Sequence, residues 1–168
     1  MLEKDNYVIY GGYGVCRVAD VRSETMYKKT QTYYILTPLD NAGMAIYIPV
    51  NNDALISRMR KIPCREEILC LLDGLREEKL VLEKDNRLRA EQLDLILDRC
   101  DQRELILLVR TLWEKRKALA MQNKKICTAD DNALKRAEKI INGEFGFALS
   151  MAPEDVPAFI ADRLAQTD

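Results

Sequence analysis

The spacing of apolar positions changes near residue 60 and divides the chain into two unlike segments. Ahead of it, runs rich in β-branched and aromatic residues, such as 7–10 and 32–36, stand between turn residues. Beyond it, leucine and isoleucine recur every three or four residues, as they do on one face of a helix. We therefore predict an α+β protein with one domain over residues 1–60 and a second over residues 61–168.

The first segment predicts a small antiparallel β-barrel of the SH3 or Tudor type. Short strands bounded by glycine, proline and asparagine suit this architecture, and a sheet of about 50 residues keeps at least one exposed edge. The sequence Gly11-Gly12-Tyr13-Gly14 joins two strands and opens no helix, so it is interpreted as a turn and not as a phosphate cradle. The expected strands cover residues 7–10, 14–21, 32–36, 44–48 and a short 54–56.

The second segment predicts a compact bundle of four or five helices. The basic run RMRKIPCR, residues 58–65, is interpreted as a solvated linker ahead of it. Asp101 and Glu104 resemble a capping box, and Thr128 precedes two acids that favour a helix start. The helical patterns cover residues 66–75 and 87–97 and begin again near Asp101, Thr128 and Pro153.

Composition argues against catalysis and against a metal centre. The chain has no histidine, and its five cysteines show no CxxC spacing, so the usual general base and zinc-ligand pairs are missing. No glycine-rich phosphate loop or GxSxG motif is present. We expect a protein that is not an enzyme, with reduced thiols and no cofactor.

Charge and the N-terminal sequence indicate a cytoplasmic protein without bulk attraction to DNA or membranes. The net charge is −1, and the first residues, MLEKDN, lack the basic and apolar regions of a signal peptide. Contact with nucleic acid would need a local basic patch. Lys84, Arg87 and Arg89 form the candidate patch, and the alternative is a solvated helix face with pairs such as Arg87–Glu91. Trp113 lies beside an apolar stripe, which favours a core or rim position.

Several motifs in order resemble the CarD family of bacterial RNA polymerase-binding transcription regulators. The first domain of that family is shared with the transcription-repair coupling factor. Tyr10, Gly14-Val15 and the closing Ile48-Pro49-Val50 match its strand motifs. Residues 109–113, VRTLW, and the helical pattern from residue 128 to residue 149 are similar to its helical motifs.

The resemblance implies a docking protein with two contacts. In the family, the first domain joins a strand edge of the RNA polymerase β subunit. The helical domain then lies on promoter DNA, where a tryptophan wedges into the minor groove and stabilises the open complex. By this resemblance the polymerase-binding residues are Glu24, Met44, Ile46, Tyr47, Ile48 and Pro49, and the DNA-binding residues are Lys84, Asp85, Asn86, Arg87 and Arg89.

The chain departs from the family at three of these positions. Asp85 or Asn86 stands where the family has its wedge tryptophan, and Trp113 is not the equivalent residue. Tyr47 and Glu24 replace family arginines. The leading hypothesis is a transcription regulator that docks on the β subunit and modulates open-complex stability. The alternative is an adaptor whose β-domain and helical bundle bind two proteins without DNA.

Overall fold

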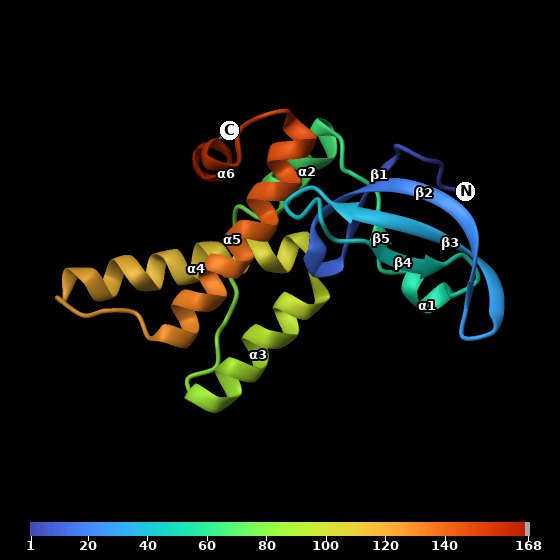
Figure 1. The fold of residues 1–168 in the computed structure, drawn as a ribbon. Coiled ribbons are helices and arrows are strands. Elements are labelled where there is room, and N and C mark those ends of the chain that lie inside the picture. The colour runs from blue at the N-terminus through green and yellow to red at the C-terminus, as the bar shows by residue number, and fades with distance from the viewer. Residues whose placement is uncertain (167–168) are drawn as a thin grey trace. The chain divides into compact units, whose positions relative to one another are not determined.

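A computed structural model describes residues 1–166 of the chain, which separate into two compact units. The first unit is Met1–Ile62, and the second begins at Pro63 and includes the remaining described residues. The first holds the strands and the second holds most of the helices (Figure 1). The α+β class predicted from the spacing of apolar residues is therefore confirmed.

Five antiparallel strands form the sheet of the first unit. Their order is β4-β3-β2-β1-β5, so that β4 and β5 lie at the two edges. The β2–β3 hairpin is long and strongly twisted (Figure 1). The strand bounds are Tyr7–Tyr10 for β1, Val15–Met26 for β2, Lys29–Pro38 for β3, Ile46–Pro49 for β4 and Met59–Arg60 for β5.

The sheet is open and does not form the small SH3- or Tudor-type barrel that we predicted, although it keeps an exposed edge. Closure requires the two edge strands to pair along their length. Here β4 has four residues and β5 has two, whereas β2 has twelve and β3 has ten. Strand β4 pairs only with residues 33–36 of β3, β5 pairs only with β1, and no β4–β5 pairing occurs among the residues that the structure describes.

A β-bulge in β2 decides which side chains face the core. The register shifts between Val18, which is opposite Leu36, and Asp20, which is opposite Ile35. One extra residue in a strand moves the following side chains to the other face. Before the bulge Cys16 and Val18 face the core, whereas after it Val21 packs against the core and the even-numbered residues lie on the other face of the sheet.

Two of the predicted elements around residue 55 are wrong. Residues Asp53–Ile56 form the short helix α1 instead of a strand, because the side chain of Asn52 caps it by accepting a hydrogen bond from the N–H of Leu55 at 3.2 Å. The basic run 58–65 is also more than a linker. Its residues Met59 and Arg60 form β5 on β1, and the guanidinium of Arg58 lies 5.8 Å from the ring centroid of Tyr10.

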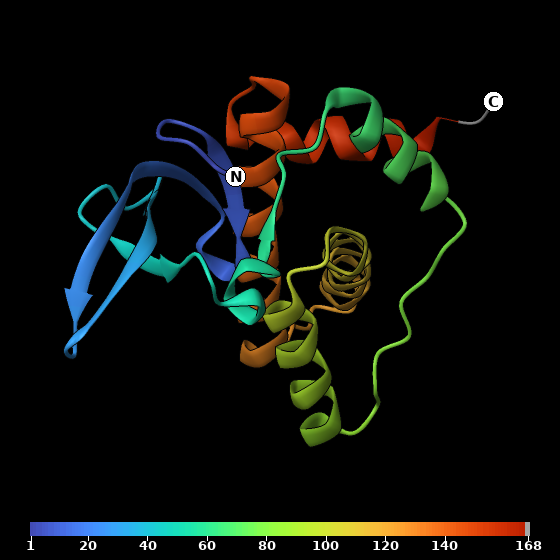
Figure 2. The same cartoon turned by 90° about the vertical axis from the view of Figure 1, so that its right-hand side faces the viewer.

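Five helices longer than one turn make up the second unit, within the predicted range. Helix α5 is central, since it contacts each of the other four (Figure 2). Its predicted apolar face, Leu134, Ala137, Ile141 and Phe145, is buried. The helices are α2 Arg65–Gly74, α3 Asn86–Arg99, α4 Gln102–Met121, α5 Thr128–Leu149 and α6 Val156–Ala165, the last preceded by a 3-10 turn, Pro153–Asp155.

Helix boundaries follow the capping residues seen in the sequence. Asp101 accepts a hydrogen bond from the N–H of Glu104 at 2.9 Å and begins α4. Helix α5 begins at Thr128, as predicted. Within residues 1–166, none of the helices combines the length and the apolar composition that a membrane crossing requires.

Candidate functional site

The β4 edge offers unpaired backbone groups at Tyr47. In an antiparallel ladder, opposite residues alternate between pairs that exchange hydrogen bonds and pairs that do not. The N–H of Val50 donates to the C=O of Thr32 at 3.0 Å, which makes this pair a hydrogen-bonded one. Counting back, the pair of Tyr47 with Ile35 is not hydrogen-bonded. The N–H and C=O of Tyr47 therefore point away from β3, toward the free edge.

Pro49 limits this edge to a short stretch. It lies opposite Tyr33 in a pair that is not hydrogen-bonded, so its ring faces outward and brings no N–H to the edge. Proline in a sheet is confined to such positions. Tyr47 is thus the residue in the middle of β4 that can both donate and accept a hydrogen bond with an added strand.

The side chains around this edge differ in their exposure. Met44 and Tyr47 are each 37% exposed, whereas Ile48 is buried in the core of the unit and Ile46 packs against that core. The Tyr47 ring meets the Tyr33 ring edge to face, with centroids 6.1 Å apart. Of the predicted polymerase-binding residues, Ile46 and Ile48 stand in hydrogen-bonded pairs with Leu36 and Tyr34, so their backbone groups bond β3 and are not available at the free edge.

Glu24 lies on the same face of the sheet as Tyr47. It is opposite Gln31 on β3, while Tyr47 is opposite Ile35, and these positions alternate onto one face. Strand spacing and rise place the two residues on the order of 16 Å apart. Arg22 lies between Glu24 and Asp20, at 2.7 Å and 3.2 Å from their carboxylate oxygens.

Comparison with known families decides what this unit is. Residues 2–62 match the family described as the CarD-like/TRCF RID domain. The N-terminal unit is a CarD-like/TRCF RID domain. The resemblance predicted from the strand motifs is thereby confirmed for this unit. The match ends at residue 62, the last residue of the first unit.

RID domains interact with the β subunit of RNA polymerase, and the family is associated with transcription. A search of curated proteins finds no match to the chain. The RID domain here keeps an open strand edge at β4, the kind of edge to which another strand can be added.

At the second predicted site, the start of α3, the side chains of Asp85 and Asn86 form hydrogen bonds within the protein. Asp85 is the N-cap of α3, and its carboxylate accepts hydrogen bonds from the N–H groups of Arg87 and Leu88, both at 3.0 Å. The side-chain oxygen of Asn86 accepts a hydrogen bond from Arg89 at 2.8 Å. Both side chains that take the place of the wedge tryptophan therefore hold the helix start.

Arg89 is buried and does not reach the surface. Its Nε is 3.0 Å from Asp130, and Nη1 donates to the carbonyl oxygens of Glu83 and Lys84. Asp130 is 1% exposed and also binds Lys115. Burial alone would raise the pKa of Asp130, but the hydrogen bonds from Lys115 and Arg89 outweigh it and hold that pKa below its usual value. This pairing could not be predicted from the sequence pattern, because 41 residues separate Arg89 from Asp130.

Lys84 and Arg87 are the predicted cations that remain at the surface. Both are exposed, and neither forms an ion pair within the described part of the chain. The structure also brings in the segment ahead of α5, since Cys127 lies 3.9 Å from Arg89. Lys124 and Lys125, exposed and two or three residues before Cys127, join this end of the unit. Four exposed cations thus lie near the starts of α3 and α5, whereas the carboxylate of Asp85 already bonds two N–H groups of α3 and the first turn of α5 carries Asp130 and Asp131.

The structure also bears on metal binding, on the reactivity of Cys16 and on the position of Trp113. No group of three or more potential metal ligands occurs among residues 1–166. Burial, assisted by Asp40, raises the pKa of the Cys16 thiol to about 11, which makes it a poor nucleophile. Trp113 is 38% exposed at a rim position, and its indole N–H donates to Glu138 at 2.7 Å.

Proposed function

We propose that this chain is a transcription regulator that docks on the RNA polymerase β subunit through its RID domain. The free N–H and C=O of Tyr47 at the β4 edge carry the proposal. They let a strand of the β subunit extend the sheet, a mode in which backbone hydrogen bonds supply affinity and neighbouring side chains supply specificity.

The charges at the docking face indicate which residues a partner strand would carry. Glu24 and Asp20 are anionic and enclose Arg22, while the edge itself carries the uncharged ring of Tyr47. A partner strand with an apolar or aromatic residue opposite Tyr47 would pack on that ring. A basic residue near the hairpin would meet the two carboxylates.

Docking is tested by direct binding of the full chain to the isolated β subunit. A saturable 1:1 complex is expected, and its affinity should depend little on salt because backbone hydrogen bonds carry it. The proposal is refuted if the chain binds neither the β subunit nor core RNA polymerase.

We propose further that the helical unit modulates the promoter open complex through the basic end formed by Lys84, Arg87, Lys124 and Lys125. The exposed side chains of these four cations support phosphate contact. Arg89 is not included in this surface because Asp130 and two carbonyl groups occupy it. Asp85 and Asn86 take part by holding the helix start that presents Arg87.

Removing two of these cations is expected to change the salt dependence of the promoter complex. Each phosphate contact contributes about 0.9 to the slope of log affinity against log salt, so Lys84→Ala with Arg87→Ala should lower the slope by about 2. The measurement is the lifetime of polymerase–promoter open complexes, with the chain bound, over a series of salt concentrations. Arg99→Ala, at the opposite end of α3, is the matched control.

An unchanged slope in the double variant would favour the alternative function, an adaptor that binds a second protein. The specific observation behind this alternative is that the helical unit keeps an apolar hollow between α4, α5 and α6, whereas positions 85 and 86 carry no wedge residue. In that case the chain would still bind polymerase, but its effect on open complexes would not follow the exposed cations.

A further inference from the structure

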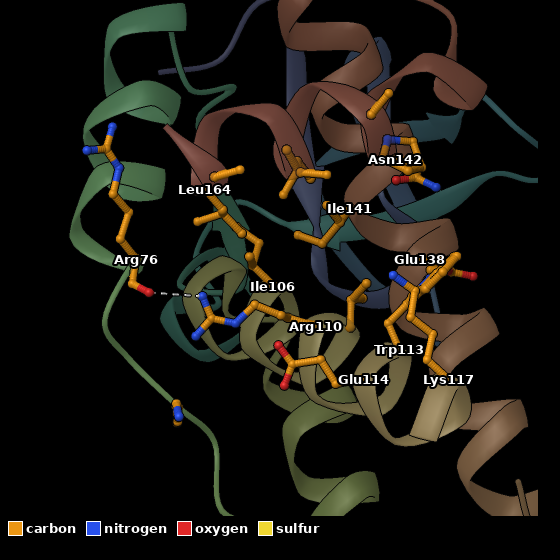
Figure 3. A pocket seen from close by; sticks show the side chains of 17 residues that line it. Arg76, Ile106, Arg110, Trp113, Glu114, Lys117, Glu138, Ile141, Asn142 and Leu164 are labelled. Atoms are coloured by element: carbon orange, nitrogen blue, oxygen red, sulfur yellow. Dashed lines mark hydrogen bonds between the residues drawn. The ribbon is translucent and has the colours of Figure 1, made fainter. Parts of the chain in front are cut away.

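Helices α4, α5 and α6 leave a hollow of about 760 Å³ in the helical unit (Figure 3). On α6 the small side chains Ala158, Ala161 and Ala165 line it beside Pro157, Ile160 and Leu164, and larger residues at the alanine positions would fill part of the space. The hollow opens to solvent, since Ala158, Ala161 and Ala165 are exposed. Hollows of roughly 300–1,000 Å³ are the size that small-molecule sites have.

Apolar side chains form the floor of this hollow. Ile106 from α4, Ile141 from α5 and Leu164 from α6 converge on it (Figure 3). Trp113 forms one wall. Its ring is held by the hydrogen bond to Glu138 and by the guanidinium of Arg116, 4.6 Å from the ring centroid. An aromatic wall over an aliphatic floor suits the apolar body of a ligand.

The rim of the hollow is mainly cationic. Lys79, Arg110 and Lys117 line it, and none of the three forms an ion pair with a carboxylate among residues 1–166. Arg76 also lines it but is paired with Asp73 at 2.8 Å. Arg110 is held in place, because its Nη1 donates to the carbonyl oxygen of Leu75 at 3.0 Å. Four cations thus stand against two carboxylates, Glu114 and Glu138.

We propose that this hollow binds a small amphipathic anion, with an apolar body on the floor and an anionic head group at the rim near Lys79 and Arg110. The charge of the rim selects an anion over a cation of the same shape. The site lies wholly in the helical unit, so it stands or falls independently of polymerase docking. A ligand there would contact α4, α5 and α6 at once and would stabilise the unit in proportion to its occupancy.

Trp113 provides a direct readout, because it is the only tryptophan in the chain. Titrating the full-length protein with decanoate is expected to give a saturable blue shift of tryptophan emission as the indole loses water. Decyltrimethylammonium, which has the same chain and the opposite charge, should bind at least fivefold more weakly, since exposed charge interactions change affinity by about two- to fivefold each.

Two variants locate the binding. Ala161→Phe places a ring in the hollow from an exposed position and should abolish the decanoate response, whereas Ala118→Phe, on the exposed surface of α4 outside the hollow, should leave it intact. Lys79→Gln should weaken decanoate by about two- to fivefold, and the matched Lys124→Gln should not. Unchanged circular dichroism of each variant shows that the unit is folded.

Three outcomes would overturn the proposal. One is the absence of a saturable response to decanoate. Another is a response that survives in Ala161→Phe, which would place the ligand elsewhere. The third is equal or tighter binding of decyltrimethylammonium. If decanoate fails and an amphipathic peptide with acidic flanks shifts the emission instead, the hollow is a groove for a partner helix.

Discussion

Tyr47→Pro is expected to abolish most of the affinity for the RNA polymerase β subunit while leaving the chain folded. The N–H of Tyr47 points to the free edge, so proline removes a donor for the incoming strand without removing one from the β3–β4 ladder. Losing that hydrogen bond and leaving the partner's carbonyl unsatisfied should cost about 2–3 kcal/mol, or about 30- to 150-fold in Kd. The measurement is a binding titration with the isolated β subunit.

Tyr47→Ala is the matched control, since it keeps the backbone and removes only the exposed ring. It should weaken binding far less than proline does. Urea unfolding of both variants checks that the RID domain remains folded. Equal losses in the two variants would contradict strand addition and would show that the tyrosine ring, not the backbone edge, supplies the affinity.

Asp130→Ala is expected to destabilise the helical unit by about 3–5 kcal/mol, because it leaves the guanidinium of Arg89 buried without its carboxylate. The pair joins the start of α3 to the start of α5, so the loss falls on both helices. This is a large part of the roughly 5–15 kcal/mol that stabilises a typical domain. Chemical unfolding followed by circular dichroism measures it.

Asp131→Ala, one residue away, is the matched control. Asp131 pairs with Arg116 and Lys135 near the surface, where ion pairs contribute about 1 kcal/mol or less. The double variant Arg89→Met with Asp130→Ala should recover much of the stability lost by Asp130→Ala, because no buried charge is left unpaired. Similar losses for Asp130→Ala and Asp131→Ala would argue against a buried pair.

The same pair predicts a loss of stability in acid. The pKa of Asp130 is lower in the folded state than the ordinary aspartate value of about 3.9, so the folded state prefers the carboxylate. Its contribution is complete above pH of about 4 and is lost as the pH falls through the lower folded-state pKa. The difference in unfolding free energy between the natural chain and Asp130→Ala should therefore shrink below pH of about 4. A constant difference would contradict this.

Much of the fold could be predicted from local patterns in the sequence. Strand β1 and the starts of α4 and α5 follow from side-chain periodicity and capping residues, which act within a few residues of the chain. The strand-to-helix change near residue 60 is likewise local. Helix α1 was missed because the three apolar residues at 54–56 carry no period of their own, and the decisive signal is the cap at Asn52.

Features that depend on residues far apart in the sequence could not be predicted from local patterns. The bulge at Val18 and Asp20 is defined by the partner strand, and it puts Glu24 on the same face as Tyr47. The burial of Arg89 depends on Asp130, which belongs to another helix. In sequence, Arg89 looks like Arg87, its neighbour two positions earlier. Only the packing of α3 on α5 separates a surface cation from a structural one.

The shortness of β4 also limits self-association of the protein. A long exposed strand edge would pair with any extended chain, including other copies of this one, and would invite fibrillar stacking. Here Pro49 ends the edge two residues after Tyr47, so a random strand gains very few hydrogen bonds. A partner strand that binds β4 stably must therefore also make side-chain contacts. The same truncation disfavours edge-to-edge pairing between copies of the chain.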